Sequence, residues 1–289
     1  MQRKRVLSIV VTYNAADWLN TCLKSLQNSD LANDVLVVDN SSSDETLDLI
    51  QTHYPEVLLF PQKQNLGFGK ANNAGFEYAL KHEYEYIFLL NQDAAILPET
   101  LQQLVDCHQQ NKDYGIISPM QNFAENQLDR YFASYLEKHL STAELSEIKG
   151  DKNRQKDIYF IPYVNAAIWL ISRECLLEVG GFDPDFEHYG EDDEYMQRVL
   201  FFKYKIGICP KAIGFHYRKQ AESLKQELKG EALQKFVLRH ALVLIKDRRL
   251  PFWRRSINAK LFVLKYVIKS FLKFRFGDGF KLGYLFFLR

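Results

Sequence analysis

The sequence is poor in cysteine and has no paired cysteine motif. Its cysteines are Cys22, Cys107, Cys175 and Cys209, which lie far apart and form no C-x-x-C pair. A structural zinc site and a disulfide framework are therefore not indicated, and we expect a reducing, cytoplasmic setting. The sequence also has no internal repeat and no low-complexity run, and its composition is neither that of a disordered protein nor that of a fibrous one.

Long apolar runs are missing near both ends of the chain. Residues 1–14 begin with basic side chains, but Ser8 and Thr12 interrupt the apolar run and no small-residue cleavage site follows. We therefore expect a first strand there and no signal peptide. Near the other end, the longest uncharged stretch is far below the ~20 residues that a transmembrane helix needs.

Charge is present in both signs but is unevenly distributed. The 289 residues, 47% of them apolar, are enough for a full hydrophobic core, and the formal net charge is +1. Residues 246–289 contain twelve Lys or Arg but only Asp247 and Asp278, so this segment carries +10 and the preceding residues carry about −9. We predict a catalytic domain over residues 1–218 and a basic, amphipathic, helical region over residues 219–289.

Short β-branched runs alternate with amphipathic stretches in the first half of the chain. Strands are predicted at residues 6–11, 35–38, 57–60 and 86–90, with helical spacing between them. This order is typical of an α/β fold with a Rossmann-like, mostly parallel sheet flanked by helices. A nucleotide-binding half would occupy residues 1–119 and an acceptor-side half residues 158–218. The polar, weakly patterned residues 121–157 are predicted to be a variable or mobile insertion.

Polar residues follow the predicted strands, at the edge where ligands lie in an open α/β sheet. Asp93 comes just after an apolar strand and could bind a divalent cation that holds phosphate oxygens, or it could cap a helix beginning near Pro98. Asp39 follows the second strand and could accept hydrogen bonds from a ribose or a base, or only build the turn. Residues 42–45 have the Ser-x-x-Glu form of a capping box, which predicts that a helix begins right after this strand.

A glycine-containing segment, residues 65–73, could bring backbone N–H groups and Lys70 close to a diphosphate. It is not a P-loop because the Gly-Lys-Ser/Thr ending is missing. It also lacks the third glycine of a dinucleotide-binding fingerprint.

Four acids occur in a row at residues 191–194, after Gly190 and at the start of a predicted helix. Consecutive helical residues point about 100° apart, so we expect at most two of the four to face one pocket. Crowded carboxylates raise one another's proton affinity, which suits a general base, and a solvated helix start is the alternative. His216 follows a predicted edge strand and is either a ligand or, as a single histidine usually is, structural.

In combination these segments resemble the family 2 glycosyltransferases, which are inverting enzymes with the GT-A fold. The resemblance covers residues 5–218. It is carried by Val-Val-Thr-Tyr-Asn at 10–14, Val-Val-Asp-Asn-Ser-Ser-Ser-Asp-Glu-Thr at 37–46, Asn-Leu-Gly-Phe-Gly at 65–69, Asn-Gln-Asp at 91–93, Gly-Gly-Phe-Asp at 180–183 and Gly-Glu-Asp-Asp-Glu at 190–194.

The resemblance implies a role for each matching residue. The nucleotide sugar would be bound by Thr12, Asn14, Asp39, Asn65, Gly67, Lys70, Asn73 and Asn91. Because Asn91 replaces the first acid of the family's Asp-x-Asp metal motif, Asp93 and His216 would hold the divalent cation, Mg²⁺ or Mn²⁺, with weaker metal dependence than usual. Asn72 stands where the family often has Arg, so diphosphate binding would rely more on Lys70 and the metal.

The resemblance also implies the catalytic residues and the reaction. Asp192 would be the catalytic base, with Glu191 beside it and Asp193 as the less favoured candidate. The enzyme would move a sugar from a UDP- or dTDP-linked donor to a glycan hydroxyl in bacterial surface polysaccharide synthesis, and its motifs look most like those of rhamnosyltransferases. The surroundings of Trp169 and the insertion 121–157 would select the substrates.

Two other functions remain open. A nucleotidyltransferase that makes sugar nucleotides is disfavoured, because the first predicted strand is not followed by a glycine-rich loop bearing Arg and Lys. A catalytically inactive nucleotide-sugar-binding module is the second alternative, because the first acid of the metal motif is missing. The acids at 191–194 argue against this second alternative.

The basic region 248–289 predicts peripheral binding to an anionic membrane. Apolar positions recur at helical spacing at Phe262, Val263, Tyr266, Val267, Ser270, Phe271 and Phe274, and Lys265, Lys269 and Lys273 lie along another side. Such a helix can lie in the interface with its rings in the acyl boundary. This would place the enzyme at the inner face of the plasma membrane, beside a glycan or lipid-linked glycan acceptor. In the alternative the rings pack on the catalytic domain or on a second subunit, so a homodimer is possible; no nucleic-acid partner is expected because no reader motif accompanies the basic residues.

Overall fold

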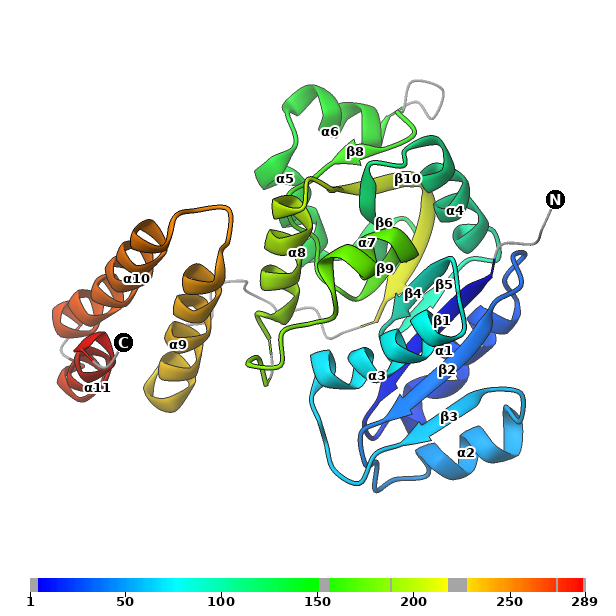
Figure 1. Cartoon of the computed structure of the whole chain (residues 1–289), viewed down its shortest axis with the longest axis horizontal. Coiled ribbons are helices and arrows are strands. Elements are labelled where there is room, and N and C mark those ends of the chain that lie inside the picture. Colours follow the sequence, from blue (N-terminus) through cyan, green and yellow to red (C-terminus); the bar gives the residue numbers. More distant parts are fainter. Residues whose placement is uncertain (1–4, 151–155, 188, 218–227, 274, 288–289) are drawn as a thin grey trace.

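The computed structural model contains a mixed α/β body followed by a layer formed by the C-terminal helices (Figure 1). It describes residues 5–150, 156–187, 189–217, 228–273 and 275–287. The first half runs β1 (Val6–Thr12), α1 (Ala16–Gln27), β2 (Asp34–Asp39), α2 (Thr46–His53), β3 (Leu58–Pro61), α3 (Phe68–Lys81) and β4 (Tyr86–Leu90). The second half runs β5 (Ala94–Ile96), α4 (Thr100–Gln110), β6 (Tyr114–Ala124), β7 (Gln127–Leu128), α5 (Arg130–His139), α6 (Thr142–Lys149), β8 (Tyr159–Phe160), β9 (Ile168–Ser172), α7 (Arg173–Val179), α8 (Glu191–Phe201) and β10 (Lys205–His216).

The central sheet has the strand order β3-β2-β1-β4-β9-β6-β10-β5. The first four strands are parallel, as the sequence predicts. Beyond them the sheet is mixed, because β9 is antiparallel to both β4 and β6, and β5 is antiparallel to β10. The chain leaves β1 for β2 and β3 on one side and then places β4 on the other side. The carboxyl ends of β1 and β4 therefore form the switch point where ligands lie in such sheets.

Helices cover both faces of the sheet because successive strand residues point to opposite sides. Val6 and Val10 of β1 belong to a buried cluster with α1, α2 and α4, whereas Leu7 and Ile9 pack with α3, α7 and α8. The helix α3 lies very close to β1. A Cβ atom at Gly75 would come within 2.6 Å of Ile9, so this approach requires glycine.

The predicted insertion is largely folded. Within residues 121–150, α5 buries Phe132 and Leu136 in the main core. Asp129 caps α5 by accepting a hydrogen bond from the Phe132 N–H at 2.8 Å, and Ser141 opens α6 with a capping box. The weak pattern of these residues therefore reflects helix caps and outer helix faces, and variability or mobility of the insertion stays a prediction. Residues 151–155 of the insertion lie outside the described part of the chain.

The capping box predicted at residues 42–45 is wrong in its details. The helix α2 begins at Thr46, and its first residues are not capped by the Ser42 hydroxyl. That hydroxyl bonds to Asp39 instead, at 2.5 Å. The N-cap of α2 is Glu45, whose side chain makes no capping hydrogen bond, and the Asp44 carboxylate accepts from the Thr46 N–H at 3.1 Å.

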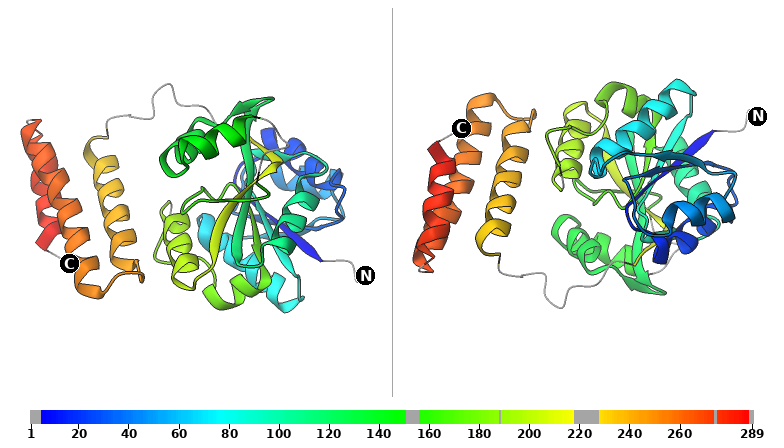
Figure 2. Two further views of the ribbon diagram at one scale, coloured as in Figure 1. Left: turned by 90° about the horizontal axis from the view of Figure 1, so that it is seen from above. Right: turned by 90° about the horizontal axis from the view of Figure 1, so that it is seen from below.

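The C-terminal layer consists of α9 (Gly230–Lys246), α10 (Phe252–Leu272) and α11 (Phe276–Phe287). The views agree that α9 lies between the body and the α10–α11 pair (Figure 2). The layer has its own core, formed by Leu233, Val237, Ala241, Ala259, Val263 and Leu282. Phe262 and Tyr266 pack on Phe236 of α9, with ring centroids 6.3 Å and 5.6 Å away. The face predicted to enter a membrane is therefore an internal face of this layer.

Candidate active site

A cavity of about 750 Å³ opens where the carboxyl ends of β4 and β10 meet the start of α8. Its described lining is drawn from segments far apart in the sequence: Phe68, Asn91, Asp93, Tyr135, Tyr163, Asn165, Ala166, Ala167, Tyr189, Gly190, Glu191, Asp192, Asp193, His216, Arg239, His240 and Val243. Among the predicted site residues, those after β4, at the start of α8 and at the end of β10 are brought together here.

Asp93 and His216 lie side by side in this cavity. The antiparallel pairing of β5 with β10 places His216 opposite Ala94, so the imidazole Nε2 comes within 3.4 Å of an Asp93 carboxylate oxygen. His216 is buried and its Nδ1 has no hydrogen-bond partner among the described residues. The strand β10 lies inside the sheet between β6 and β5, so the prediction of an edge strand is wrong. The predicted capping role of Asp93 is also not seen, since α4 begins at Thr100 after Glu99.

A carboxylate beside an imidazole suits a divalent cation that takes its remaining ligands from phosphate and water. No group of three or more His, Cys, Asp or Glu able to hold a metal occurs among the residues that the structure describes. The pair formed by Asp93 and His216 therefore fits a cation shared with a bound diphosphate better than a cage made by the protein alone.

Three of the four acids at the start of α8 line the cavity. They are Glu191, Asp192 and Asp193, so the expectation that at most two could face one pocket is wrong. The cavity lies over the N-terminal end of the helix, and Cα–Cβ bonds tilt toward that end, so the whole first turn can reach it. Gly190, with φ at +93°, makes the bend that brings the helix end to the cavity.

Burial raises the pKa of all three carboxyls. Burial and then the neighbouring charge of Asp192 raise the pKa of Glu191 and of Asp193 to about 7. The pKa of Asp192 is also raised by burial, opposed by hydrogen bonds from backbone N–H groups and from the Tyr163 hydroxyl. One Asp192 oxygen accepts from the Asp193 N–H at 2.9 Å and the other lies 3.5 Å from the Tyr163 hydroxyl. Such a cluster can hold and release a proton near neutral pH.

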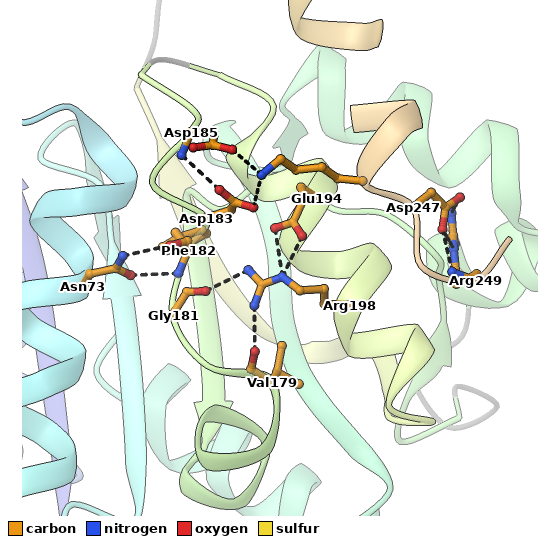
Figure 3. Close-up of polar contacts among 11 residues, drawn as sticks. Asn73, Val179, Gly181, Phe182, Asp183, Asp185, Glu194, Arg198, Asp247 and Arg249 are labelled. Carbon is orange, nitrogen blue, oxygen red and sulfur yellow. Dashed lines mark hydrogen bonds and ion pairs between the residues drawn. The ribbon is translucent and has the colours of Figure 1, made fainter. Parts of the chain in front are cut away.

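The fourth acid, Glu194, is structural. Its buried carboxylate binds Arg198 Nε at 2.7 Å and 2.9 Å. The same guanidinium donates to the carbonyl oxygens of Val179 and Gly181, both at 2.7 Å (Figure 3). Arg198 therefore holds the Gly-Gly-Phe-Asp loop against α8.

Asn73 holds the same loop from the other side. Its amide donates to the Phe182 carbonyl at 2.9 Å and accepts from the Phe182 N–H at 2.7 Å (Figure 3). A Cβ at Gly181 would lie 2.5 Å from the Asn73 amide oxygen. Asn73 was predicted to bind the nucleotide sugar, but it does not line the cavity and its amide is engaged by this loop.

The predicted nucleotide residues of the first half form a separate hydrogen-bonded cluster. Asp39 is fully buried and accepts from the Thr12 hydroxyl at 2.8 Å and from the Ser42 N–H at 2.9 Å. Asn14 accepts from the Ser43 N–H at 2.9 Å. These hydrogen bonds match the alternative role of Asp39, which is to build the turn. None of Thr12, Asn14 and Asp39 lines the cavity described above, so nucleotide binding by them stays a prediction.

The segment before α3 is shaped by Gly67, whose φ is +79°. Asn65 accepts from the Gly67 N–H at 2.9 Å, and the Asn40 amide donates to the Gly67 carbonyl at 3.3 Å. Lys70 is half-buried on α3. Asn65, Gly67 and Lys70 do not line the cavity, and their contacts with a diphosphate also stay a prediction.

Comparison with known proteins identifies the family. The glycosyl transferase family 2 model matches residues 8–180, which is more than half of the chain. The chain belongs to the family 2 glycosyltransferases. Together with the GT-A-like sheet, this match confirms the fold class and the enzyme class predicted from the sequence.

Curated relatives support the same assignment for this glycosyltransferase. It is 34% identical to the undecaprenyl-phosphate mannosyltransferase of Micrococcus luteus over 105 residues, which is 35% of this chain and 43% of that protein. It is 21% identical over 274 residues to the minor teichoic acid biosynthesis protein GgaB of Bacillus subtilis, covering 92% of this chain and 29% of GgaB. The chain thus spans less than half the length of each of these relatives.

Solved structures show the same fold. Residues 1–349 of TarS from S. aureus, in complex with UDP, align with a TM-score of 0.59 and 16% identity over 90% of this chain and 70% of that one. The mannosyltransferase PcManGT from Pyrobaculum calidifontis, in complex with GDP-Man and Mn²⁺, aligns with a TM-score of 0.56 and 20% identity over 90% of this chain and 65% of that one.

Several cavity residues of this glycosyltransferase were missed from the sequence. Tyr135 of α5 contacts Tyr163 at a ring distance of 4.8 Å, and the buried amide oxygen of Asn165 finds no hydrogen-bond partner within the part of the chain that the structure describes. The polar break at Asn165 within an apolar segment was a signal that could have found it. Arg239 of α9 stacks over Tyr189 at 4.9 Å and carried no signal, because it lies in a segment predicted only as a basic tail. Trp169, expected to shape the pocket, is fully buried in the core and does not line it.

Proposed function

We propose that this family 2 glycosyltransferase moves a hexosyl group from a UDP- or dTDP-linked donor to a glycan hydroxyl, with inversion, in bacterial surface polysaccharide synthesis. The observation that carries the proposal is a single cavity with the acids Glu191 and Asp192 at one helix end and the Asp93–His216 pair at the strand ends. A base and a place for a leaving diphosphate are what a single displacement at the anomeric carbon requires.

Asp192 acts as the base in this mechanism. It takes the proton from the acceptor hydroxyl while that oxygen attacks the anomeric carbon from the face opposite the leaving diphosphate. Its raised pKa makes it a stronger base than an ordinary aspartate, and the Asp193 N–H and Tyr163 hydroxyl fix its direction. A divalent cation bound by Asp93 and His216 would neutralise charge on the diphosphate.

The donor is held by the first half of the sheet. Thr12, Asn14 and Asp39 at the strand ends would face the nucleotide, and the stretch from Asn65 to Lys70 would approach the diphosphate. The UDP in the related TarS structures supports a uridine or thymidine donor, and the GDP-Man and Mn²⁺ in PcManGT support a nucleotide sugar with a divalent cation. The rhamnosyltransferase-like subtype stays a prediction.

The acceptor is a glycan or a lipid-linked glycan at the inner face of the plasma membrane. The relatives that act on undecaprenyl phosphate or in teichoic acid synthesis support this class of acceptor. In the described part of the chain, no helix combines the length and the apolar character needed to cross a bilayer.

The mechanism is tested with Asp192→Asn. Transfer from the donor that gives turnover should fall by roughly 10² to 10⁴, while nucleotide affinity stays nearly unchanged. A thermal-shift series with UDP, dTDP and GDP, with and without Mn²⁺, identifies the donor base first. Near-normal turnover in Asp192→Asn together with loss in Asp193→Asn would move the base by one residue. A chain that binds a nucleotide sugar but turns over none with any acceptor would be the inactive binding module instead.

A further inference from the structure

The helix α10 is apolar on two opposite faces. One face packs inside the C-terminal layer through Ala259, Val263 and Ser270, all of which are buried. A second face carries Ile257, Leu261, Leu264, Ile268 and Leu272, all of which are exposed. Their spacing of three or four residues places them in one row along the helix. This row lies opposite the packed face.

The helix α11 extends this row. Phe276, Phe280 and Tyr284 are exposed and four residues apart, so they also share one helix face. The ring of Phe271 on α10 contacts Phe276 at 5.9 Å and Phe280 at 5.3 Å, which joins the two rows. We call the exposed side chains of both rows the outer apolar surface: Ile257, Leu261, Leu264, Ile268, Leu272, Phe276, Phe280 and Tyr284.

The outer apolar surface belongs to the two helices farthest from the catalytic body. The helix α9 separates them from it in every view (Figures 1 and 2). Exposure here is large, with Leu272 at 75% and Leu261 at 58%. Soluble monomers rarely expose a contiguous apolar surface of this kind without a partner.

Cations border the surface and acids are missing from it. Lys260 precedes the apolar Leu261, and Lys265 and Lys269 lie one turn apart along the other border; all three are exposed. In residues 248–289 the sequence contains one acid, Asp278. Its carboxylate is turned inward, where it accepts from the Gly230 N–H at 3.3 Å.

We propose that the outer apolar surface docks on an anionic lipid bilayer. Leucine and aromatic side chains would enter the acyl boundary while the bordering lysines contact anionic headgroups. A second copy of this chain fits less well, because a two-fold contact would face the surface with itself and bring lysine rows together without an acid between them. Only the biological role of docking, the delivery of the active site to a membrane-borne acceptor, rests on the proposed function.

The test is flotation of the full chain with vesicles of phosphatidylcholine, with or without phosphatidylglycerol. The wild type should float with the vesicles that contain phosphatidylglycerol and should be released by high salt. In Leu261→Ser/Ile268→Ser/Leu272→Ser the constant for partitioning onto the vesicles should fall by about tenfold or more per residue, because each change removes a side chain from the apolar phase. The matched control is Leu177→Ser in the catalytic body, since Leu177 is exposed at 58%, as Leu261 is.

Charge is tested separately. Lys260→Gln/Lys265→Gln/Lys269→Gln should weaken binding to the anionic vesicles by about fivefold per lysine. The control is Lys24→Gln/Lys81→Gln/Lys112→Gln, which removes the same charge from exposed positions of the body. This control should float as the wild type does.

Several results would overturn the proposal. One is a wild type that stays with the unbound protein in both vesicle types, and another is a leucine-to-serine triple variant that floats as the wild type does. A third is a wild-type dimer in light scattering that the same triple variant dissociates, with flotation unchanged, which would assign the surface to a second copy. Flotation needs no donor or acceptor, and Asp192→Asn should float normally, so loss of transfer and loss of docking are distinguishable.

Discussion

Neutralising Glu191 should stabilise the protein at alkaline pH. Its side chain is only 6% exposed, and its Oε2 has no hydrogen-bond partner among the described residues. Burial and the adjacent charge of Asp192 raise its pKa from 4.5 to about 7, against the opposing effect of Arg239. The ionised form of Glu191 is therefore held in the folded protein at a cost, which Glu191→Gln removes while keeping the shape of the side chain.

The size of the effect depends on pH. The pKa of Glu191 is higher in the folded than in the unfolded protein. Its contribution to stability is therefore fully present below the unfolded pKa, and it is lost as the pH rises through the folded pKa of about 7. With these values the ionised Glu191 destabilises the fold by about 3 kcal/mol near pH 8 and by less than about 1 kcal/mol near pH 5. The free energy of unfolding of Glu191→Gln should exceed that of the wild type by up to these amounts.

Urea denaturation of both proteins between these pH values measures the difference. The matched control is Glu194→Gln, one turn along the same helix. Its carboxylate is equally buried but paired with Arg198, so this substitution should destabilise the protein by about 3 kcal/mol and leave a buried cation. A Glu191→Gln protein no more stable than wild type near pH 8, or a gain that does not shrink toward pH 5, would refute the reasoning.

Three further predictions concern the cavity and the loop beside it. Asp93→Asn should abolish the additional thermal shift that Mn²⁺ gives in the presence of UDP, and an unchanged shift would remove the metal from this carboxylate. Asn73→Ala should lower the free energy of unfolding by about 1 to 3 kcal/mol, because it leaves the Phe182 N–H and carbonyl unpaired, and urea denaturation measures this. Arg239→Gln should shift the loss of stability to higher pH, because the charge of Arg239 lowers the pKa of Glu191. Arg239→Lys should restore the wild-type pH profile, and an identical pH profile in both variants would count against that influence.

Much of the fold could be predicted because β1 and β4 are buried on both faces, most of β2 is buried, and the strands of the first half stand between helical repeats. The runs near Val6, Val35 and Tyr86 therefore give clear signals, and their order implies a parallel arrangement. The second half is harder. The strand β9 inserts antiparallel between β4 and β6, and nothing in the run Ile168–Ser172 distinguishes this direction from the parallel one.

The sequence motifs located the candidate site but did not show which side chains interact with one another there. Motifs place Asp93, His216 and Asp192 at element ends, and these residues do meet at one cavity. They do not show which atoms bind one another: the hydrogen bonds between the Asn73 amide and Phe182 could not be read from the sequence, and donor binding by Asn73 stays a prediction. In the tail, helical periodicity finds apolar rows but cannot tell the row that packs from the row that faces outward, and Tyr266 was placed on the wrong one.

The cavity is lined by two parts of the chain, one inside the family 2 match and one after it. The family 2 match ends at residue 180, whereas the acids of α8, His216 and Arg239 all come later. Lys246, at the end of α9, forms an ion pair with Asp183 at 2.6 Å. The later part of the chain therefore also contacts the loop that directly follows the matched residues. Exchange of residues 181–246 as one block between related enzymes would therefore carry Glu191, Asp192, His216 and Arg239 together with the Lys246–Asp183 ion pair, whereas a break at residue 218 would separate Arg239 from the other cavity residues.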